Sequence, residues 1–152
     1  MFLAQFIAPV LVLAAALVAC VKRTRRRRLL RAVVQSGRFE VLNEVPSSDF
    51  ALMVTEAFRS RGYKVGELAG GDLEVRRDGS CWPVQRKQWR GILGVGMVRE
   101  FHNVLSRSSR SSAFMVTSGL FSDEAIAYAR DTGVRLVDGR ELFAMLQAMA
   151  NR

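Results

Sequence analysis

A short run of alternating residues around a predicted turn carries groups that could hydrolyse a phosphate ester. Asp78-Gly79 is a strong signal for a two-residue hairpin turn. If the flanking strands pair symmetrically about this turn, Asp72 lies opposite Gln85, and Lys87 projects from the same face two residues on. A carboxylate, an amide oxygen and an ammonium group then gather at one end of the hairpin.

These three groups suit chemistry that depends on a divalent cation. Mg²⁺ takes one or two carboxylates together with carbonyl oxygens, waters and substrate phosphate, so Asp72 and Gln85 are candidate metal ligands. Lys87 is a candidate for orienting the attacking water and for offsetting charge in the transition state. Glu74 shares the polar face and is a candidate auxiliary acid. The alternative is an ordinary exposed hairpin face, since a slip of one residue would rearrange the set.

The elements that must hold this hairpin alternate between strand and helix patterns. A helix after Pro46 is predicted to have Ser48 or Asp49 as its N-cap and to end at Gly62. Loops are predicted at 91–96 and 106–112. Strands are predicted from 63 and over 72–77, 81–88, 113–117 and 134–137, with further helices over 97–105, 122–131 and 140–149. This order predicts an α/β fold, a mixed β-sheet with helices on its faces.

The N-terminal part of the chain has a different character. Residues 2–21 contain no charged side chain and, as a helix, would span roughly 30 Å, the thickness of a bilayer core. Seven of the 23 Lys and Arg residues follow directly in residues 22–31. This charge pattern predicts a single-pass transmembrane helix in the inner membrane, with the N-terminus outside and the C-terminal domain in the cytoplasm. Anionic lipid headgroups are the expected partners of residues 22–31.

The chain therefore divides into a transmembrane helix (1–21), a basic juxtamembrane segment with a connector (22–46) and one folded domain (47–152). The 16 basic residues outside the basic segment exceed the 14 acids by only two, so the net charge of +9 says little about the domain. An alternative interpretation is a bacterial lipobox over residues 17–20, with a lipid attached to Cys20. Neither Cys20 nor Cys81 has a CxxC partner or a nearby histidine, which argues against a zinc site and a disulfide framework.

Several segments resemble, in order and at compatible spacing, the Mrr-like branch of the PD-(D/E)xK nucleases. The similarity covers about residues 48–147 and is far more specific than the three-residue pattern alone. It implies a restriction-endonuclease-like fold and a Mg²⁺-dependent endonuclease with DNA as its substrate. The segments are 72–73 (DL), 76–79 (RRDG), 84–89 (VQRKQW), 98–101 (VREF), 116–119 (VTSG), 121–125 (FSDEA) and 136–139 (LVDG).

The resemblance also implies roles for the hairpin residues. Asp72 would ligate Mg²⁺, and Gln85 would occupy a position that is acidic in most of the superfamily and Gln in this branch. Lys87 would be the catalytic lysine. Apart from the resemblance, Arg107 and Arg110 in a serine-rich loop are candidate contacts to DNA phosphates, although an exposed mobile loop would have the same composition. The backbone N–H groups at Ser118 and the following glycine are a further candidate phosphate contact, but the sequence favours a turn at the end of a strand there.

Two departures from the family pattern bear on activity. Ala51 stands where the family usually has a glutamate that contributes to the site, and the loop before the aspartate is shortened to residues 69–71. Glu74, Glu56 or Glu67 could replace the missing acid, and no spacing argument chooses among them. Two functions stay open: a membrane-anchored endonuclease, and a catalytically weakened nuclease-fold module that binds nucleic acid or a protein partner at the membrane. A homodimer is compatible with either.

Overall fold

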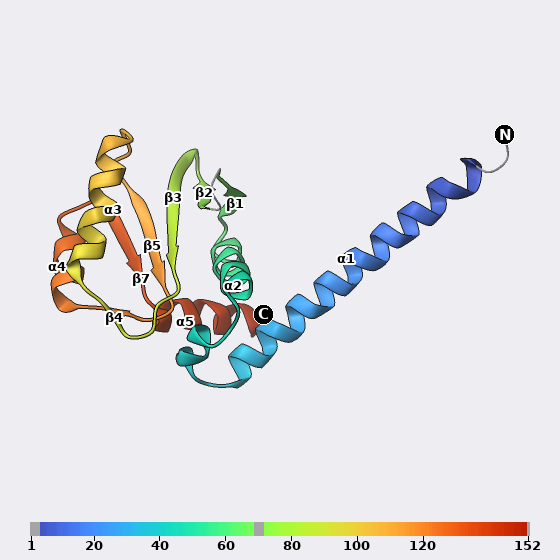
Figure 1. Cartoon of the computed structure of the whole chain (residues 1–152), viewed down its shortest axis with the longest axis horizontal. Coiled ribbons are helices and arrows are strands. Elements are labelled where there is room, and N and C mark those ends of the chain that lie inside the picture. Colours follow the sequence, from blue (N-terminus) through green and yellow to red (C-terminus); the bar gives the residue numbers. More distant parts are fainter. Residues whose placement is uncertain (1–3, 69–71, 152) are drawn as a thin grey trace.

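The computed structural model describes residues 4–68 and 72–151, with side chains from residue 10 onward. A long N-terminal helix leads into a mixed α/β domain (Figure 1). The helices are α1 (Ala4–Gln35), the 3-10 helix η1 (Phe39–Asn43), α2 (Ser47–Ser60), α3 (Val95–Arg107), α4 (Asp123–Arg130) and α5 (Gly139–Ala150). The strands are β1 (Lys64–Glu67), β2 (Leu73–Arg77), β3 (Ser80–Lys87), β4 (Ile92–Leu93), β5 (Ala113–Thr117), β6 (Leu120–Phe121) and β7 (Val134–Val137).

The sheet is mixed, as the sequence predicts. Its five strands lie in the order β1-β2-β3-β5-β7, with antiparallel pairing from β1 to β3 and parallel pairing from β3 to β7. Short strands β4 and β6 pair separately, in parallel. Neither was predicted, and the loop expected over 91–96 is wrong at Ile92 and Leu93. A strand of two residues is too short to show a period, so only its tertiary partner creates it.

The hairpin forms with the predicted register. Asp78 and Gly79 both have positive φ, 52° and 78°, as a type I′ turn requires. Leu73 pairs with Val84 in the antiparallel ladder of β2 and β3. Both side chains are buried in the core, and the polar face of the hairpin is therefore turned away from it.

Helices cover both faces of the sheet and enclose two apolar clusters (Figure 1). Residues of β5 point alternately into the two clusters: Phe114 and Val116 pack with α2 and α5, whereas Ala113 and Met115 pack with α3 and α4. A central strand buried on both faces is typical of parallel sheets between helical layers. The domain is thus a three-layer arrangement in which α2 and α3 lie on opposite sides of the hairpin.

The start of α2 differs from the prediction. Neither Ser48 nor Asp49 is the N-cap: that position is Pro46, and it makes no side-chain capping bond. The carbonyl oxygen of Pro46 instead accepts bonds from the backbone N–H groups of Asp49 and Phe50, each at 2.9 Å. Because the helix begins two residues early, Asp49 lies in its first turn, where a negative charge favours the helix dipole.

The basic segment is part of one continuous helix, α1, which extends into the predicted connector and ends at Gln35. Leu30, Val33 and Leu42 are buried in the cluster shared with α2 and α5, so part of the predicted connector packs on the domain. The predicted span, residues 2–21, lies partly outside the described residues, which include side chains only from residue 10. Among the residues that were described, we find no helix with the length and apolar character needed to cross a membrane.

The loops that follow β3, β5 and β7 pack closely, backbone against backbone. The backbone N–H of Leu120 donates to the carbonyl of Gly91 at 2.9 Å, and that of Gly139 donates to the carbonyl of Gly119 at 2.7 Å. A Cβ at Gly119 would collide with the carbonyl oxygens of Trp89 and Gly91. Both obstacles are backbone atoms, so no rotamer change relieves the contact.

We therefore expect Gly119→Ala to lower the free energy of unfolding by about 1–3 kcal/mol, the usual cost of overpacking. Denaturant unfolding of the purified full chain measures this change. The matched control is Gly66→Ala in β1, where a Cβ meets no atom within 4 Å. Equal stability of the two variants would contradict the proposed close approach.

Candidate active site

The structure brings Asp72, Gln85 and Lys87 to one cleft, with a volume of about 230 Å³, between the hairpin and α3. Asp72 directly precedes β2, whereas Gln85 and Lys87 are alternate residues of β3 and so share a face. Asp72 is exposed, and the other two side chains are half-buried. Three residues that are separate in sequence thus line the walls of a single hollow.

The surrounding backbone explains why these side chains are held there. Gln85 is the register partner of Met115 and Lys87 that of Thr117, so both stand over the middle of the sheet rather than at its edge. The backbone N–H of Leu68 donates to the carbonyl of Asp72 at 2.7 Å, which closes the connection between β1 and β2 next to the aspartate. The shortened loop noted in the sequence, residues 69–71, lies outside the described residues.

A fourth polar side chain, Glu100 of α3, lines the same cleft and was not named as a site residue from the sequence. Met97, Phe101 and Val104 line it as well, so one helical face forms the wall opposite the hairpin. The helical spacing of these residues was visible in the sequence. Which face of α3 meets the hairpin was not visible, because that depends on packing against the sheet.

Glu74 lies on the same face of the hairpin but does not line the cleft. Its carboxylate accepts a bond from Nε of Arg76 at 2.8 Å and lies 3.5 Å from Arg110. A hydrogen bond from the Cys81 thiol and, next, the Arg76 guanidinium lower the pKa of Glu74 from its usual value. This carboxylate is therefore ionised and held by cations outside the cleft.

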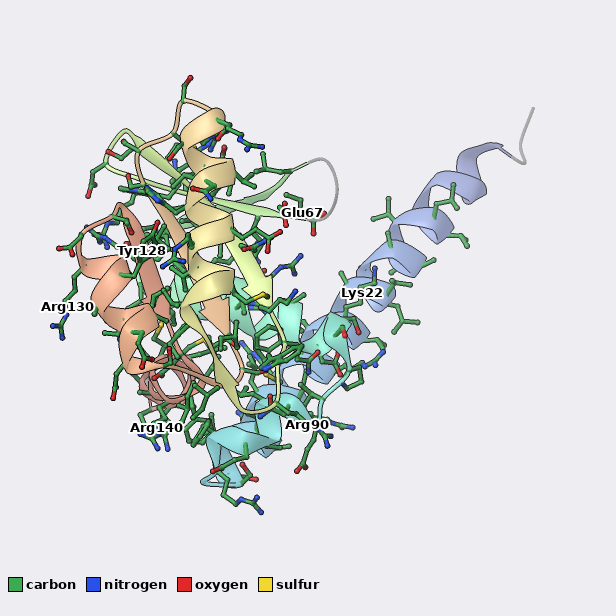
Figure 2. The ribbon with its side chains drawn as sticks, turned by 60° about the vertical axis from the view of Figure 1, so that its left-hand side comes forward. Lys22, Glu67, Arg90, Tyr128, Arg130 and Arg140 are labelled. Atoms are coloured by element: carbon green, nitrogen blue, oxygen red, sulfur yellow. The ribbon has the colours of Figure 1, made fainter. Side chains whose placement is uncertain are left out.

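The other two acids that the sequence left open also lie away from the cleft. Glu56 is buried in α2 and pairs with Arg26 of α1 and with Arg59, the latter at 3.1 Å. Glu67 is exposed at the end of β1, at the margin of the sheet (Figure 2). Ala51 does not line the cleft either.

Ser118, the candidate phosphate contact for which the sequence favours a strand-end turn, lies directly after β5. Ser118 is fully buried, and its hydroxyl accepts from the N–H of Trp89 at 2.9 Å and donates to Oδ1 of Asn43 at 2.6 Å. Its own N–H donates to the carbonyl of Lys87 at 3.4 Å. Ser118 thus braces the loop after β3. Of the two arginines predicted to contact phosphate, Arg107 is exposed in the last turn of α3, and Arg110 pairs with Glu74 as described above.

The donor set of the cleft fits a hard cation. The residues with described placement contain no group of three or more His, Cys, Asp and Glu side chains that could hold a metal by themselves. The cleft instead offers the carboxylates of Asp72 and Glu100 and the amide oxygen of Gln85. An all-oxygen set with few protein ligands, completed by water and substrate, is typical of Mg²⁺ rather than of zinc.

The comparisons with solved structures show the same mixed α/β fold. The chain is similar to the DNA modification-dependent restriction endonuclease AspBHI, with a TM-score of 0.54 and 14% identity over 82% of this chain and 35% of that one. It is also similar to AF1548, a protein of unknown function, with a TM-score of 0.51 and 17% identity over 57% of this chain and 54% of that one. The chain thus spans only about a third to a half of these structures.

The sequence comparisons differ in outcome. No curated protein matches the chain. A family model described as restriction endonuclease, the Mrr catalytic domain, matches residues 42–146. Because this match covers more than half of the chain, the chain belongs to the restriction endonuclease family of the Mrr catalytic domain.

Proposed function

We propose that the chain is a Mg²⁺-dependent endonuclease that hydrolyses DNA phosphodiester bonds. The observation that carries the proposal is the convergence of Asp72, Gln85 and Lys87 on one cleft, in a chain that belongs to a restriction endonuclease family. The family match supports a DNA nuclease role. Metal dependence rests on the oxygen-rich donor set of the cleft.

Each side chain has a distinct part in the proposed reaction. Asp72 and Gln85 would hold the cation, which supplies Lewis-acid activation of water and of the phosphate when bound. Lys87 stands beside them on β3, where its ammonium group can donate to a phosphate oxygen and offset the charge that develops there. The half-buried position of Lys87 strengthens this interaction, because charges interact more strongly where water is partly excluded.

A second candidate function is a nuclease-fold module that binds nucleic acid or a protein partner without cleaving DNA. Ala51 favours it, since that position carries no acid in this chain. Glu56, Glu67 and Glu74 were the candidate replacements for the missing acid, and all three lie outside the cleft.

Cleavage of plasmid DNA by the full chain should require Mg²⁺ or Mn²⁺. Lys87→Ala should lower the cleavage rate about 10²-fold or more, the scale of losing one electrostatic stabiliser, with little change in DNA affinity. Lys64→Ala, which removes an exposed lysine of β1 away from the cleft, is the matched control. If wild type binds DNA but cleaves it with neither metal, the protein is a binding module and not a nuclease.

We propose further that α1 anchors the chain in the inner membrane, with the N-terminus outside and the domain in the cytoplasm. Two observations support an anchor: residues 2–21 are uncharged, and α1 projects away from the domain (Figure 1). Large apolar side chains between Val10 and Val21 are 53–70% exposed. Such a continuous apolar surface is costly in water, and a bilayer would cover it.

The membrane proposal predicts that the full chain remains in the membrane fraction after alkaline extraction. A C-terminal reporter that works only in the cytoplasm should be active, because the basic residues follow the apolar run. Activity of a reporter that works only outside the cytoplasm would contradict the orientation. Metabolic labelling of Cys20 with a fatty acid would favour the lipobox instead.

Anionic phospholipid headgroups are the proposed partners of the basic segment. Where α1 passes α2 and the end of α5, a groove of about 1260 Å³ carries basic side chains beside apolar ones such as Leu29 and Leu52. Burial and, next, the nearby Arg59 lower the pKa of Arg26, which lies in this groove. The basic residues in the groove are Lys22, Arg23, Arg25, Arg26, Arg27 and Arg31.

We expect phosphatidylglycerol to raise the unfolding temperature of the detergent-solubilised full chain more than phosphatidylcholine does. The difference should shrink when Arg23→Gln and Arg27→Gln are combined, because each removes a cation worth about 1 kcal/mol near an anionic surface. The matched control combines Arg90→Gln with Arg130→Gln, which removes two exposed arginines outside residues 22–31 and outside the groove. The same shift in all three proteins would rule out the groove as the lipid site.

A further inference from the structure

We propose that Glu100 supplies the second carboxylate of the active site and binds the divalent cation together with Asp72. This inference rests on the proposed nuclease function, whose other residues come from the hairpin. Glu100 comes instead from α3, on the opposite wall of the same cleft. The cation would therefore bridge two elements that pack together only in the folded domain.

The size of the cleft is compatible with a hydrated cation between the two walls. At about 30 Å³ for each water, the 230 Å³ volume corresponds to roughly seven or eight waters. Mg²⁺ needs six ligands in octahedral geometry and keeps several of them as water. Protein oxygens from both walls, with water completing the shell, would fill such a space without a closed cage of side chains.

The rotation of α3 about its own axis is set by contacts on its other sides. Val98 and Leu105 are buried in the cluster with α4. Nδ1 of His102 and the hydroxyl of Tyr128 form a hydrogen bond at 2.9 Å, and Figure 2 shows Tyr128 on α4. Because these contacts hold α3 against α4, the face with Glu100 is turned toward the hairpin.

Glu100 differs from Glu74 of the hairpin in its ion pairs. Glu74 is held by Arg76 and Arg110. In the part of the chain that the structure describes, no ion pair involves Glu100. The carboxylates of Asp72 and Glu100 together would match the charge of one divalent cation.

A second carboxylate, on the α3 wall, would also improve the charge balance of the metal site. With Asp72 as the only carboxylate, the site would hold a divalent cation with one negative charge and a neutral amide. A second carboxylate increases the attraction for the cation, and Lys87 stays free to act on the phosphate. The arrangement falls within the one or two carboxylates that Mg²⁺ sites commonly use.

Binding of Mn²⁺ to the full chain, followed by electron paramagnetic resonance without DNA, tests the proposal directly. Glu100→Gln should weaken Mn²⁺ binding about 10-fold or more, since loss of an outer-shell partner alone costs that much. Asp72→Asn should do the same. Glu67→Gln, which removes an exposed acid outside the cleft, should bind Mn²⁺ like wild type. Circular dichroism of each variant checks that the fold is kept.

The outcomes separate this inference from the proposed function. If Glu100→Gln binds Mn²⁺ as wild type does, or if wild type binds none, Glu100 is not a ligand. Cleavage of plasmid DNA by wild type with Mg²⁺ or Mn²⁺, measured in a separate assay, would leave the nuclease function standing in either case. If Mn²⁺ binds through Asp72 and Glu100 and DNA is not cut, the metal site stands and the nuclease function fails.

Discussion

The pairing of β2 with β3 places every hairpin residue of the candidate site. Side chains alternate along a strand, so a slip of one residue would move Gln85 and Lys87 to the opposite face. Two independent features hold the register. The positive φ values of Asp78 and Gly79 match a two-residue turn, and burial of Leu73 and Val84 orients the apolar face inward. The opposite face of the hairpin is polar and carries Gln85 and Lys87.

The second wall of the cleft depends on a different constraint, the packing of helices on both faces of β5. Alternate residues of this strand enter two separate apolar clusters, which forces α2 and α3 onto opposite sides of the sheet. The hydrogen bonds between Ser118 and both Trp89 and Asn43 then hold the loop that follows β3. The cleft lies where the hairpin and α3 face each other across this framework.

Outside the cleft, ion pairs between glutamates and arginines stabilise the domain. A buried carboxylate is costly unless a cation pairs with it, and Glu56 and Glu74 each have two arginine partners. The Arg26–Glu56 pair joins α1 to α2. The basic segment is therefore linked to the domain by an ion pair in addition to the polypeptide chain. Acids engaged in this way maintain the fold and leave the cleft to side chains without such partners.

The sequence by itself determined the hairpin, its register and the order of the longer helices and strands, because turn chemistry and strand period are local properties. It also showed the charge asymmetry around α1 and the collinear resemblance to the Mrr-like nucleases. Only the tertiary structure decided that Glu100 lines the same cleft as Asp72, that Ser118 is buried, and that Ile92 and Leu93 form a strand. Each of these depends on partners distant in the chain: the rotation of α3 is set by α4, the burial of Ser118 by η1, and β4 by β6. Residue type and spacing do not show which polar face of a helix will contact another element. That contact depends on how the other faces of the helix pack, as α3 packs on α4.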